Sequence, residues 1–151
     1  MKIDDAIKSK FKSPIHRVMV NIRYTSNYFA AMQNKFMAEF SLTMPQFNIL
    51  RILRGANDSI TVNTVKERMV EKSPNTTRLM DKLIDKGLIA RERCSDDRRV
   101  VYVKITDQGL DLLSRIDAKF EEEEYAMVPA GLSDKEAQTL SDLLDKLRAG
   151  H

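Results

Sequence analysis

The chain has 151 residues, of which 42% are hydrophobic, and this length and composition suit one compact domain with a modest core. The formal net charge is only +3, yet residues 1–104 carry twenty basic and eleven acidic side chains and residues 105–151 five and eleven, which favours a polyanionic partner on one face. One cysteine excludes an internal disulfide framework, and without a signal peptide or a long apolar run we expect a cytoplasmic protein with no membrane span.

Residues 1–12 form a polar leader with four lysines, for which we expect a solvated tail, with a position near a phosphate backbone as the alternative. Ser13 and Pro14 then begin a long helix that reaches residue 40, with apolar side chains at helical spacing and no internal Gly or Pro. A domain of this size has too little surface to cover such a stripe. The helix is therefore expected to meet a second copy of the chain, and an intramolecular core helix is the alternative.

A second helix is predicted from Thr43, because Thr43 and Gln46 have the spacing of a capping box. Leu42, just before the cap, can pack against Phe47 in the first turn. The helix is apolar over most of its circumference, and Gly55 is expected to end it. Such a helix is typical of a buried position between the first helix and the segments that follow.

Two shorter helices come next. Thr61 can cap the first of them, and a turn leads into the second at residues 73–86. Ser73 is the expected cap of this second helix, Pro74 stands at its first position, and Gly87 ends it. Its buried stripe is predicted to be Thr76, Leu79, Met80 and Leu83. Two short helices joined by a turn, the second with a polar and basic outward face, indicate a helix-turn-helix.

Residues 88–94 and 100–105 have the pattern of two strands joined by a charged turn. Val101, Val103 and Ile105 alternate on the inward face of the second strand. A polar helix followed at once by a hairpin with a basic tip is typical of a winged helix. The predicted fold is therefore mainly α-helical with a small β-hairpin wing.

The rest of the chain is predicted to be helical. Thr106 can cap a helix that runs to about Met127, where residues 129–131 break it. Ser133 and Glu136 form a second capping box, which begins a last helix with leucines at helical spacing. The apolar side of the helix after the wing is expected to include Leu110, Leu113, Ile116, Phe120 and Met127.

Several short motifs are spread in a fixed order over residues 43–109: Pro45-Gln46-Phe47, Ile49-Leu50, Thr76-Thr77-Arg78-Leu79, Asp81-Lys82-Leu83, Lys86-Gly87-Leu88-Ile89, Asp97-Arg98-Arg99 and Val103-Lys104-Ile105-Thr106. In this order and spacing they resemble the MarR (multiple antibiotic resistance regulator) family of bacterial winged-helix transcription regulators. Lys66 departs from the small alanine that is usual there. The resemblance implies one domain, residues 1–151, with residues 13–40 and 107–150 as dimerisation helices and 43–106 as the DNA-binding region.

Side chains suited to DNA lie on the outward face of the second short helix. Arg78 and Lys82, about one turn apart, can reach guanine edges or phosphates. Asn75 suits adenine, and Ser73 or Thr77 can bond to phosphate at the helix N-terminus. The alternative is that these side chains are ordinary solvated surface residues.

The turn between the two predicted strands supplies the remaining candidates. Arg98 and Arg99 place guanidinium groups where a narrow minor groove would attract them. The resemblance implies that Arg99 enters the minor groove and that Asp97 braces the turn, and Arg98 is assigned to phosphate. Arg91 and Arg93 can add contacts to the DNA backbone or can simply form a solvated strand face.

No set of catalytic residues can be assembled. The two histidines, His16 and His151, are too few for a Ser-His-Asp arrangement or a zinc site of usual spacing, and no phosphate-binding glycine motif is present. The acidic run at residues 121–124 is expected to be an exposed helix face rather than a metal site. Neither an enzyme nor a cofactor or metal is therefore predicted. Cys94 is either a thiol sensor, as in some family members, or a small packing residue.

These observations predict a homodimeric repressor that occupies a palindromic operator in double-stranded DNA and leaves it when a small-molecule effector binds. A winged helix that binds another protein or RNA, and a redox-sensing regulator that uses Cys94, are the alternatives. The effector site is expected between the first long helix and the helix after Thr43. Its candidate residues are Tyr24, Tyr28, Met32, Met44, Phe47 and Arg51. They suit a small aromatic or phenolic anion, although the apolar members can also be core and Arg51 can pair with a carboxylate.

Overall fold

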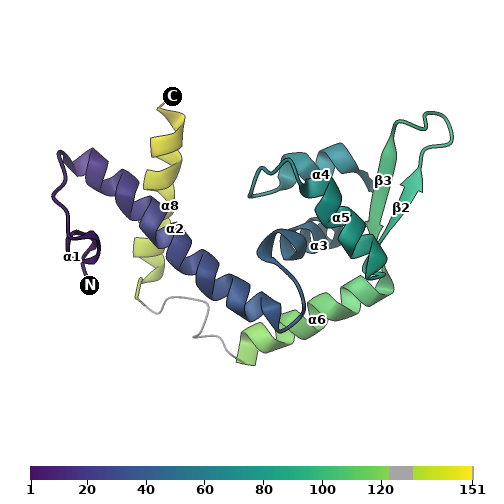
Figure 1. Ribbon diagram of the computed structural model, residues 1–151, viewed down its shortest axis with the longest axis horizontal. Coiled ribbons are helices and arrows are strands. Elements are labelled where there is room, and N and C mark those ends of the chain that lie inside the picture. The colour runs from purple at the N-terminus through teal and green to yellow at the C-terminus, as the bar shows by residue number, and fades with distance from the viewer. Residues whose placement is uncertain (123–130, 151) are drawn as a thin grey trace.

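The computed structural model describes residues 1–122 and 131–150, which form a largely helical chain with one small sheet. Its elements, in chain order, are α1 (Ile3–Ile7), α2 (Pro14–Ala38), α3 (Met44–Ala56), β1 (Ile60–Thr61), α4 (Val62–Arg68), α5 (Thr76–Asp85), β2 (Ile89–Arg93), β3 (Val101–Ile105), α6 (Asp107–Glu122) and α8 (Asp134–Ala149). Residues 44–105, called here the sheet lobe, gather at one end, with α1 and the first part of α2 at the other (Figure 1). The predicted fold class is confirmed.

Helix α2 matches the predicted long helix. The Ser13 hydroxyl accepts the His16 N–H at 3.2 Å, and Pro14 stands at the first helical position. Only Phe36 and Met37, near its C-terminal end, are buried. Five large apolar side chains along the rest of the helix are exposed: Ile15, Val18, Met19, Tyr24 and Tyr28. The long helix therefore enters the core only with its last turns.

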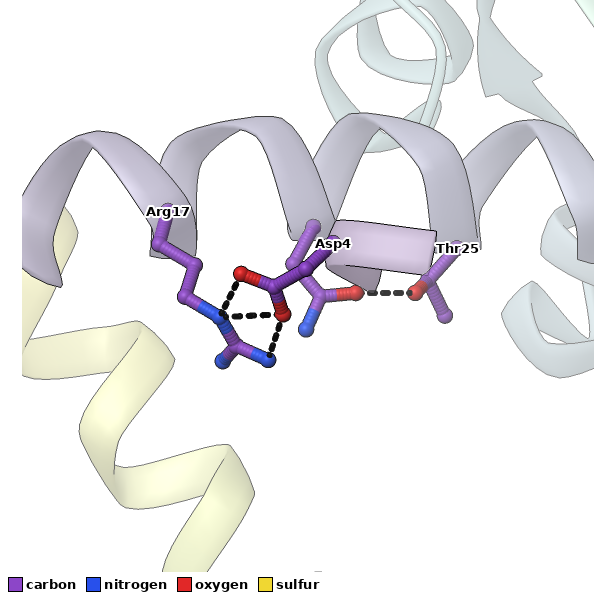
Figure 2. A network of polar contacts seen from close by, with 4 residues as sticks. Asp4, Arg17 and Thr25 are labelled. Atoms are coloured by element: carbon purple, nitrogen blue, oxygen red, sulfur yellow. Dashed lines mark hydrogen bonds and ion pairs between the residues drawn. The ribbon is translucent and has the colours of Figure 1, made fainter. Parts of the chain in front are cut away.

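The prediction of a solvated tail for residues 1–12 is wrong. Residues 3–7 form α1, which packs on α2 with Ile3 buried at 6% exposure. The Asp4 carboxylate accepts bonds from Arg17 Nε at 3.1 Å and Nη2 at 2.8 Å, and on the same stretch of α2 Thr25 bonds to Asn21 (Figure 2). The bonds from Arg17 lower the pKa of the Asp4 carboxyl from its ordinary value. A five-residue helix is too short to show an apolar periodicity in the sequence, which is why the sequence does not predict it. It is also too short to be stable alone, so tertiary contact must stabilise it.

Helix α3 begins with the predicted capping box. The Thr43 hydroxyl accepts the Gln46 N–H at 3.3 Å, and the Gln46 side chain accepts the Thr43 N–H at 3.1 Å. The prediction that Gly55 ends the helix is wrong, because the helix continues to Ala56 and Asn57 ends it with φ of 58°. Asparagine is one of the few residues besides glycine that adopt this left-handed conformation readily.

The sheet has three antiparallel strands in the order β1–β3–β2, one more than the predicted hairpin. Strand β1 is the two-residue segment Ile60–Thr61, in which Ile60 pairs with Val103 of β3. Two residues cannot show the alternation by which a strand is recognised in a sequence. Thr61 also caps α4, because its hydroxyl accepts the Thr64 N–H at 3.1 Å. The start of that helix is therefore fixed by a residue of the sheet.

One hydrophobic cluster contains residues of the sheet lobe, of the end of α2 and of α6. The cluster comprises Phe36, Met37, Leu42, Phe47, Ile49, Leu50, Leu53, Val65, Met69, Met80, Leu83, Leu88, Ile89, Val103, Leu112, Leu113 and Ile116. Leu113 and Ile116 of α6 are completely buried in it, as the predicted apolar side requires. Leu110, also predicted on this side, is 38% exposed, whereas Leu112 is buried. The buried face of the helix is therefore rotated toward Leu112 from the predicted one. The predicted end of α6 near Met127 lies outside the described residues.

Helix α8 begins with the predicted capping box. The Ser133 hydroxyl accepts the Glu136 N–H at 3.3 Å, and the Glu136 carboxylate accepts the Ser133 N–H at 2.8 Å, which lowers the pKa of Glu136. None of its residues is buried, and Leu140 and Leu143 are about half exposed. Within the described ranges, no helix is long and apolar enough to cross a bilayer.

Candidate nucleic-acid interface

Helix α5 starts two residues later than predicted. The capping role of Ser73 and the first position of Pro74 are therefore corrected: the helix begins at Thr76, with Asn75 as a cap that makes no side-chain bond. Ser73 instead closes the turn before the helix, where its hydroxyl accepts the Asn75 N–H at 3.1 Å. The Thr76 hydroxyl donates to the Ser73 carbonyl oxygen at 3.0 Å and is buried, which outweighs the preference of proline for the first helical position. Since the Asn75 side chain does not cap the first turn, N–H groups at the start of α5 can donate to a phosphate.

Three of the four residues of the predicted buried stripe of α5 are buried against the core, namely Thr76, Met80 and Leu83. Leu79 is half-buried and packs against the same core. The outward face carries four exposed polar side chains, from Asn75, Thr77, Arg78 and Lys82, while Ser73 is partly buried in the turn before them. Four of the five helix candidates are therefore solvent-exposed on α5 or at its cap, and Ser73 lies in the turn that precedes them.

The wing tip is ordered by its own side chains. Asp97 Oδ1 accepts bonds from the Arg99 backbone N–H at 3.0 Å and from Arg99 Nε at 3.2 Å. The Arg99 side chain is nevertheless 92% exposed, so its guanidinium projects from the tip (the wing is seen in Figure 1). Arg93 Nη1 donates to the Arg98 carbonyl oxygen at 3.2 Å, and the Arg98 side chain is exposed. Asp97 and Arg93 therefore hold the turn, and two arginines face outward from it.

A contact that the sequence did not indicate joins the helix to the wing. Arg91 Nη1 of β2 donates to Asp81 Oδ1 of α5 at 3.4 Å. The two residues line a cavity of about 330 Å³ between α5, the start of α4 and the wing, together with Asn63, Thr77 and Arg99. Opposite charges ten residues apart, on a helix and the next strand, are too common in a charged sequence to identify such a pair in advance.

The structure divides the predicted effector residues between two cavities. Met44, Phe47 and Arg51 line one of about 260 Å³, formed by α2, α3 and the turn after α4. The Arg51 guanidinium carbon lies 5.8 Å from the Phe47 ring centroid, and Arg51 has no carboxylate partner in the described part of the chain. The alternative that Arg51 pairs with a carboxylate is therefore not seen there.

The other predicted members lie further along α2. Tyr24 and Tyr28 line a cavity of about 270 Å³ between α1 and α2, whose wall includes Ile3. Met32 is half-buried on α2 and lines neither of these cavities. The sequence placed all six residues together because they lie on the two helices expected to meet there, and the structured α1 forms the second cavity with Tyr24 and Tyr28.

Two asparagines that sequence reasoning missed hold the walls of the 260 Å³ cavity. Asn34 Oδ1 of α2 accepts the Met44 N–H at 3.3 Å, and Asn48 Oδ1 of α3 accepts the Val70 N–H at 3.0 Å. Val70 belongs to the turn that leads into α5. Asparagine on a helix surface carries no signal in the sequence, since the bond depends on which backbone N–H the fold brings close.

The remaining chemical candidates stay isolated. Cys94 is half-buried at the end of β2, where its backbone N–H donates to the Val100 carbonyl oxygen at 3.0 Å. Among residues 1–122 and 131–150, no group of three or more His, Cys, Asp or Glu side chains could hold a metal ion.

Known proteins resemble this chain in sequence and in fold. A sequence model of the MarR family matches residues 42–101. An uncharacterised HTH-type transcriptional regulator of Bacillus subtilis (strain 168), YdgJ, is 30% identical over 116 residues, which cover 76% of this chain and 68% of the relative.

Solved structures share the fold over most of the chain. A MarR variant from E. coli complexed with operator DNA is similar with a TM-score of 0.79 and 24% identity, over 92% of this chain and 99% of that one. A structure on the regulation of DNA binding of Bordetella bronchiseptica BpsR by 6-hydroxynicotinic acid has a TM-score of 0.75 and 22% identity, over 87% and 98%. The matched family model and the sequence relative, together with the sheet lobe, its outward helix and its wing, show that the chain belongs to the MarR family of winged-helix transcription regulators.

Proposed function

We propose that this regulator is a homodimeric repressor that binds a palindromic operator and is released from it by a small-molecule effector. The observation that carries the proposal is the outward face of α5 beside a wing tip that presents Arg99. In this docking, α5 enters the major groove, where Arg78 and Lys82 read guanine edges or phosphates and Asn75 reads adenine. Arg99 enters the adjacent minor groove, and Arg98 contacts phosphate.

The proposed dimer follows from the apolar side chains that the chain leaves uncovered. Ile15, Met19 and Tyr28 of α2 are more than half exposed, and α8 has no buried residue although it carries four leucines. An amphipathic helix without a partner is unfavourable in water, and a second copy of the chain offers the matching surface. A two-fold arrangement of this kind presents two α5 helices, which is why a palindromic operator is proposed.

The proposed effector is a small aromatic or phenolic anion in the 260 Å³ cavity. Its wall offers the Phe47 ring and the Met44 thioether for an aromatic body and the Arg51 guanidinium for a carboxylate or phenolate. The turn that contains Val70 forms another part of the wall and leads into α5. A ligand that prefers one position of this turn can therefore shift the helix that is proposed to read DNA. The BpsR structure supports the choice of ligand class, because 6-hydroxynicotinic acid is an aromatic acid.

Selection of bound duplexes from random DNA tests the proposal directly. The expected result is one inverted-repeat sequence with half-sites about 10 to 10.5 base pairs between centres. Enrichment of no sequence, with equally weak binding to every duplex, would instead favour a winged helix that binds another protein or RNA. An enriched sequence with a single half-site would contradict the dimeric docking while leaving DNA recognition in place.

A further inference from the structure

We infer that the ion pair between Asp81 and Arg91 is a positioning device that sets the spacing between the helix that reads the major groove and the wing that reads the minor groove. The pair joins the middle of α5 to the middle of β2, with 3.4 Å between Arg91 Nη1 and Asp81 Oδ1. The inference rests on the proposed DNA binding and adds two residues that act through their neighbours rather than by touching a base.

Packing alone fixes only the base of the wing. Leu83 of α5, Ile89 of β2 and Val103 of β3 are fully buried there, so helix and sheet are firmly joined at that level. Beside this contact, Thr77 and Asp81 of α5 and Arg91 and Arg99 of the wing line the 330 Å³ cavity. Apart from Ile89 and Val103, the residues of β2 and β3 are exposed or half-buried, so little packing holds the angle of the outer part of the wing. The Asp81–Arg91 pair joins α5 to β2 at the level of Val103, where this packing ends.

The position of Arg91 makes the angle matter at the tip. Arg91 pairs with Val103 in the ladder, and the ribbon continues from there to Asp97 and Arg99. A strand rises about 3.3 Å per residue, so a small rotation at Arg91 becomes a larger displacement at the wing tip. Both DNA contacts can be made at once only if the tip and α5 match the spacing of the two grooves.

The exposure of the pair argues against a role in overall stability. The Arg91 and Asp81 side chains are 46% and 52% exposed, and ion pairs in such positions contribute little to the free energy of unfolding. Orientation is the property that such a pair can still control. Removal of either partner is therefore expected to leave a folded protein whose two contact regions are less well matched.

A competing role for Arg91 makes opposite predictions. If Arg91 is a phosphate contact that Asp81 holds aside, then Asp81→Asn frees a positive charge and strengthens binding to every duplex. If the pair is a positioning device, Asp81→Asn weakens binding to the operator and leaves binding to unrelated DNA nearly unchanged. The sign of one measurement thus separates the two roles.

The experiment is a double-mutant cycle with Asp81→Asn, Arg91→Gln and the combined variant. Dissociation constants are measured for the selected operator and for a scrambled duplex over a range of salt concentrations. Each single change is expected to weaken operator binding about tenfold, as for the loss of one base contact, with an unchanged melting temperature. The combined variant is expected to be no weaker than the weaker single variant, because both changes remove the same contact.

Asp111→Asn is the matched control, since it removes the carboxylate of the exposed Asp111–Arg115 pair on α6 and is expected to change neither affinity. Operator losses that add in the combined variant, or stronger binding to both duplexes after Asp81→Asn, would overturn the inference alone. A parent protein that selects no DNA sequence would overturn the proposed function and this inference with it.

Discussion

At the scale of single residues, Asp97 reduces the conformational freedom of the Arg99 side chain. A free arginine side chain loses considerable rotamer entropy when it is fixed in a groove. The bond from Arg99 Nε to Asp97 Oδ1 restricts that side chain before DNA arrives, although it is 92% exposed, and the bond from the Arg99 backbone N–H holds the turn. In the proposed docking, the carboxylate is therefore expected to contribute to affinity by preparing the arginine, at the cost of a negative charge near phosphate.

The first prediction follows from this preparation. Arg99→Ala is expected to reduce operator affinity most where the operator's minor groove is narrow, because such a groove has the stronger negative potential. Asp97→Ala is expected to reduce it in the same sequence-dependent way but less. Fluorescence anisotropy with operators that carry an A-tract or a G·C-rich segment under the wing measures both effects. Asp96→Ala, an equal change of charge at the neighbouring position, is the control, and an equal loss for it would show that charge alone matters.

The second prediction separates base reading from phosphate contact. Arg78→Ala is expected to cost about 1 to 3 kcal/mol of operator binding and to relax the preference at one base position. Arg98→Ala is expected to weaken all duplexes alike and to reduce the salt slope by about one unit. Repeated selection with each variant and titration in increasing salt provide the two measurements. Identical losses for both variants, with the salt slope unchanged, would mean that the assigned docking is wrong.

Individual site residues could be predicted from the sequence to different degrees. The outward position of Arg78 and Lys82 follows from the apolar stripe of α5, because the helical period then fixes the opposite face. The contacts of Asp81 with Arg91 and of Asn48 with Val70 could not be predicted. They depend on how two elements approach in three dimensions, and polar surface residues carry no periodic signal.

At the scale of helices and strands, predictions succeeded where a local hydrogen-bond motif defined the boundary. The capping boxes at Thr43 and Ser133 are both present. The predictions failed where tertiary contacts determine whether an element forms or where it begins. Helix α1 and strand β1 are too short to form alone, and the buried hydroxyl of Thr76 moves the start of α5. Gly55 shows the same limit, because a helix ends where the backbone turns left-handed rather than wherever glycine occurs.

The third prediction compares two glycines in helices. A Cβ at Gly109 of α6 would lie 2.3 Å from the Leu88 carbonyl oxygen, so Gly109→Ala is expected to lower the free energy of unfolding by about 1 to 3 kcal/mol. Nothing lies within 4 Å of a Cβ at Gly55 of α3, and Gly55→Ala is expected to raise it by about 0.5 to 1 kcal/mol. Urea unfolding measures both changes. The same sign for the two variants would contradict the close approach of α6 to the β2 start.

At the scale of the whole molecule, the fourth prediction concerns the number of chains. Light scattering is expected to give about twice the 17.3 kDa chain mass. Leu140→Glu combined with Leu143→Glu places charges on the uncovered side of α8 and is expected to yield monomers. Because α8 has no buried residue, circular dichroism should show at most the loss of the α8 helix for this variant, with the rest of the helical signal retained. A parent protein that is monomeric at micromolar concentration would contradict the proposed dimer.

The fifth prediction concerns release from DNA. Small aromatic acids are expected to dissociate the parent protein from its operator, and Arg51→Ala and Met44→Ala to require higher concentrations, since both side chains line the 260 Å³ cavity. Tyr28→Ala, in the separate cavity beside α1, is the control and is expected to respond like the parent. If the three variants respond alike in a release assay, the effector binds elsewhere.

Helix α6 makes the sheet lobe dependent on what flanks it. Leu113 and Ile116 complete its core, Arg54 of α3 binds Asp117 at 2.7 Å, and the Phe36 and Phe120 rings lie 4.7 Å apart. An isolated copy of residues 43–106 would leave this core open to water. Transfer of residues 43–106 alone into another chain is therefore expected to leave the core incomplete, whereas substitutions on the outward faces of α5 and the wing leave it intact.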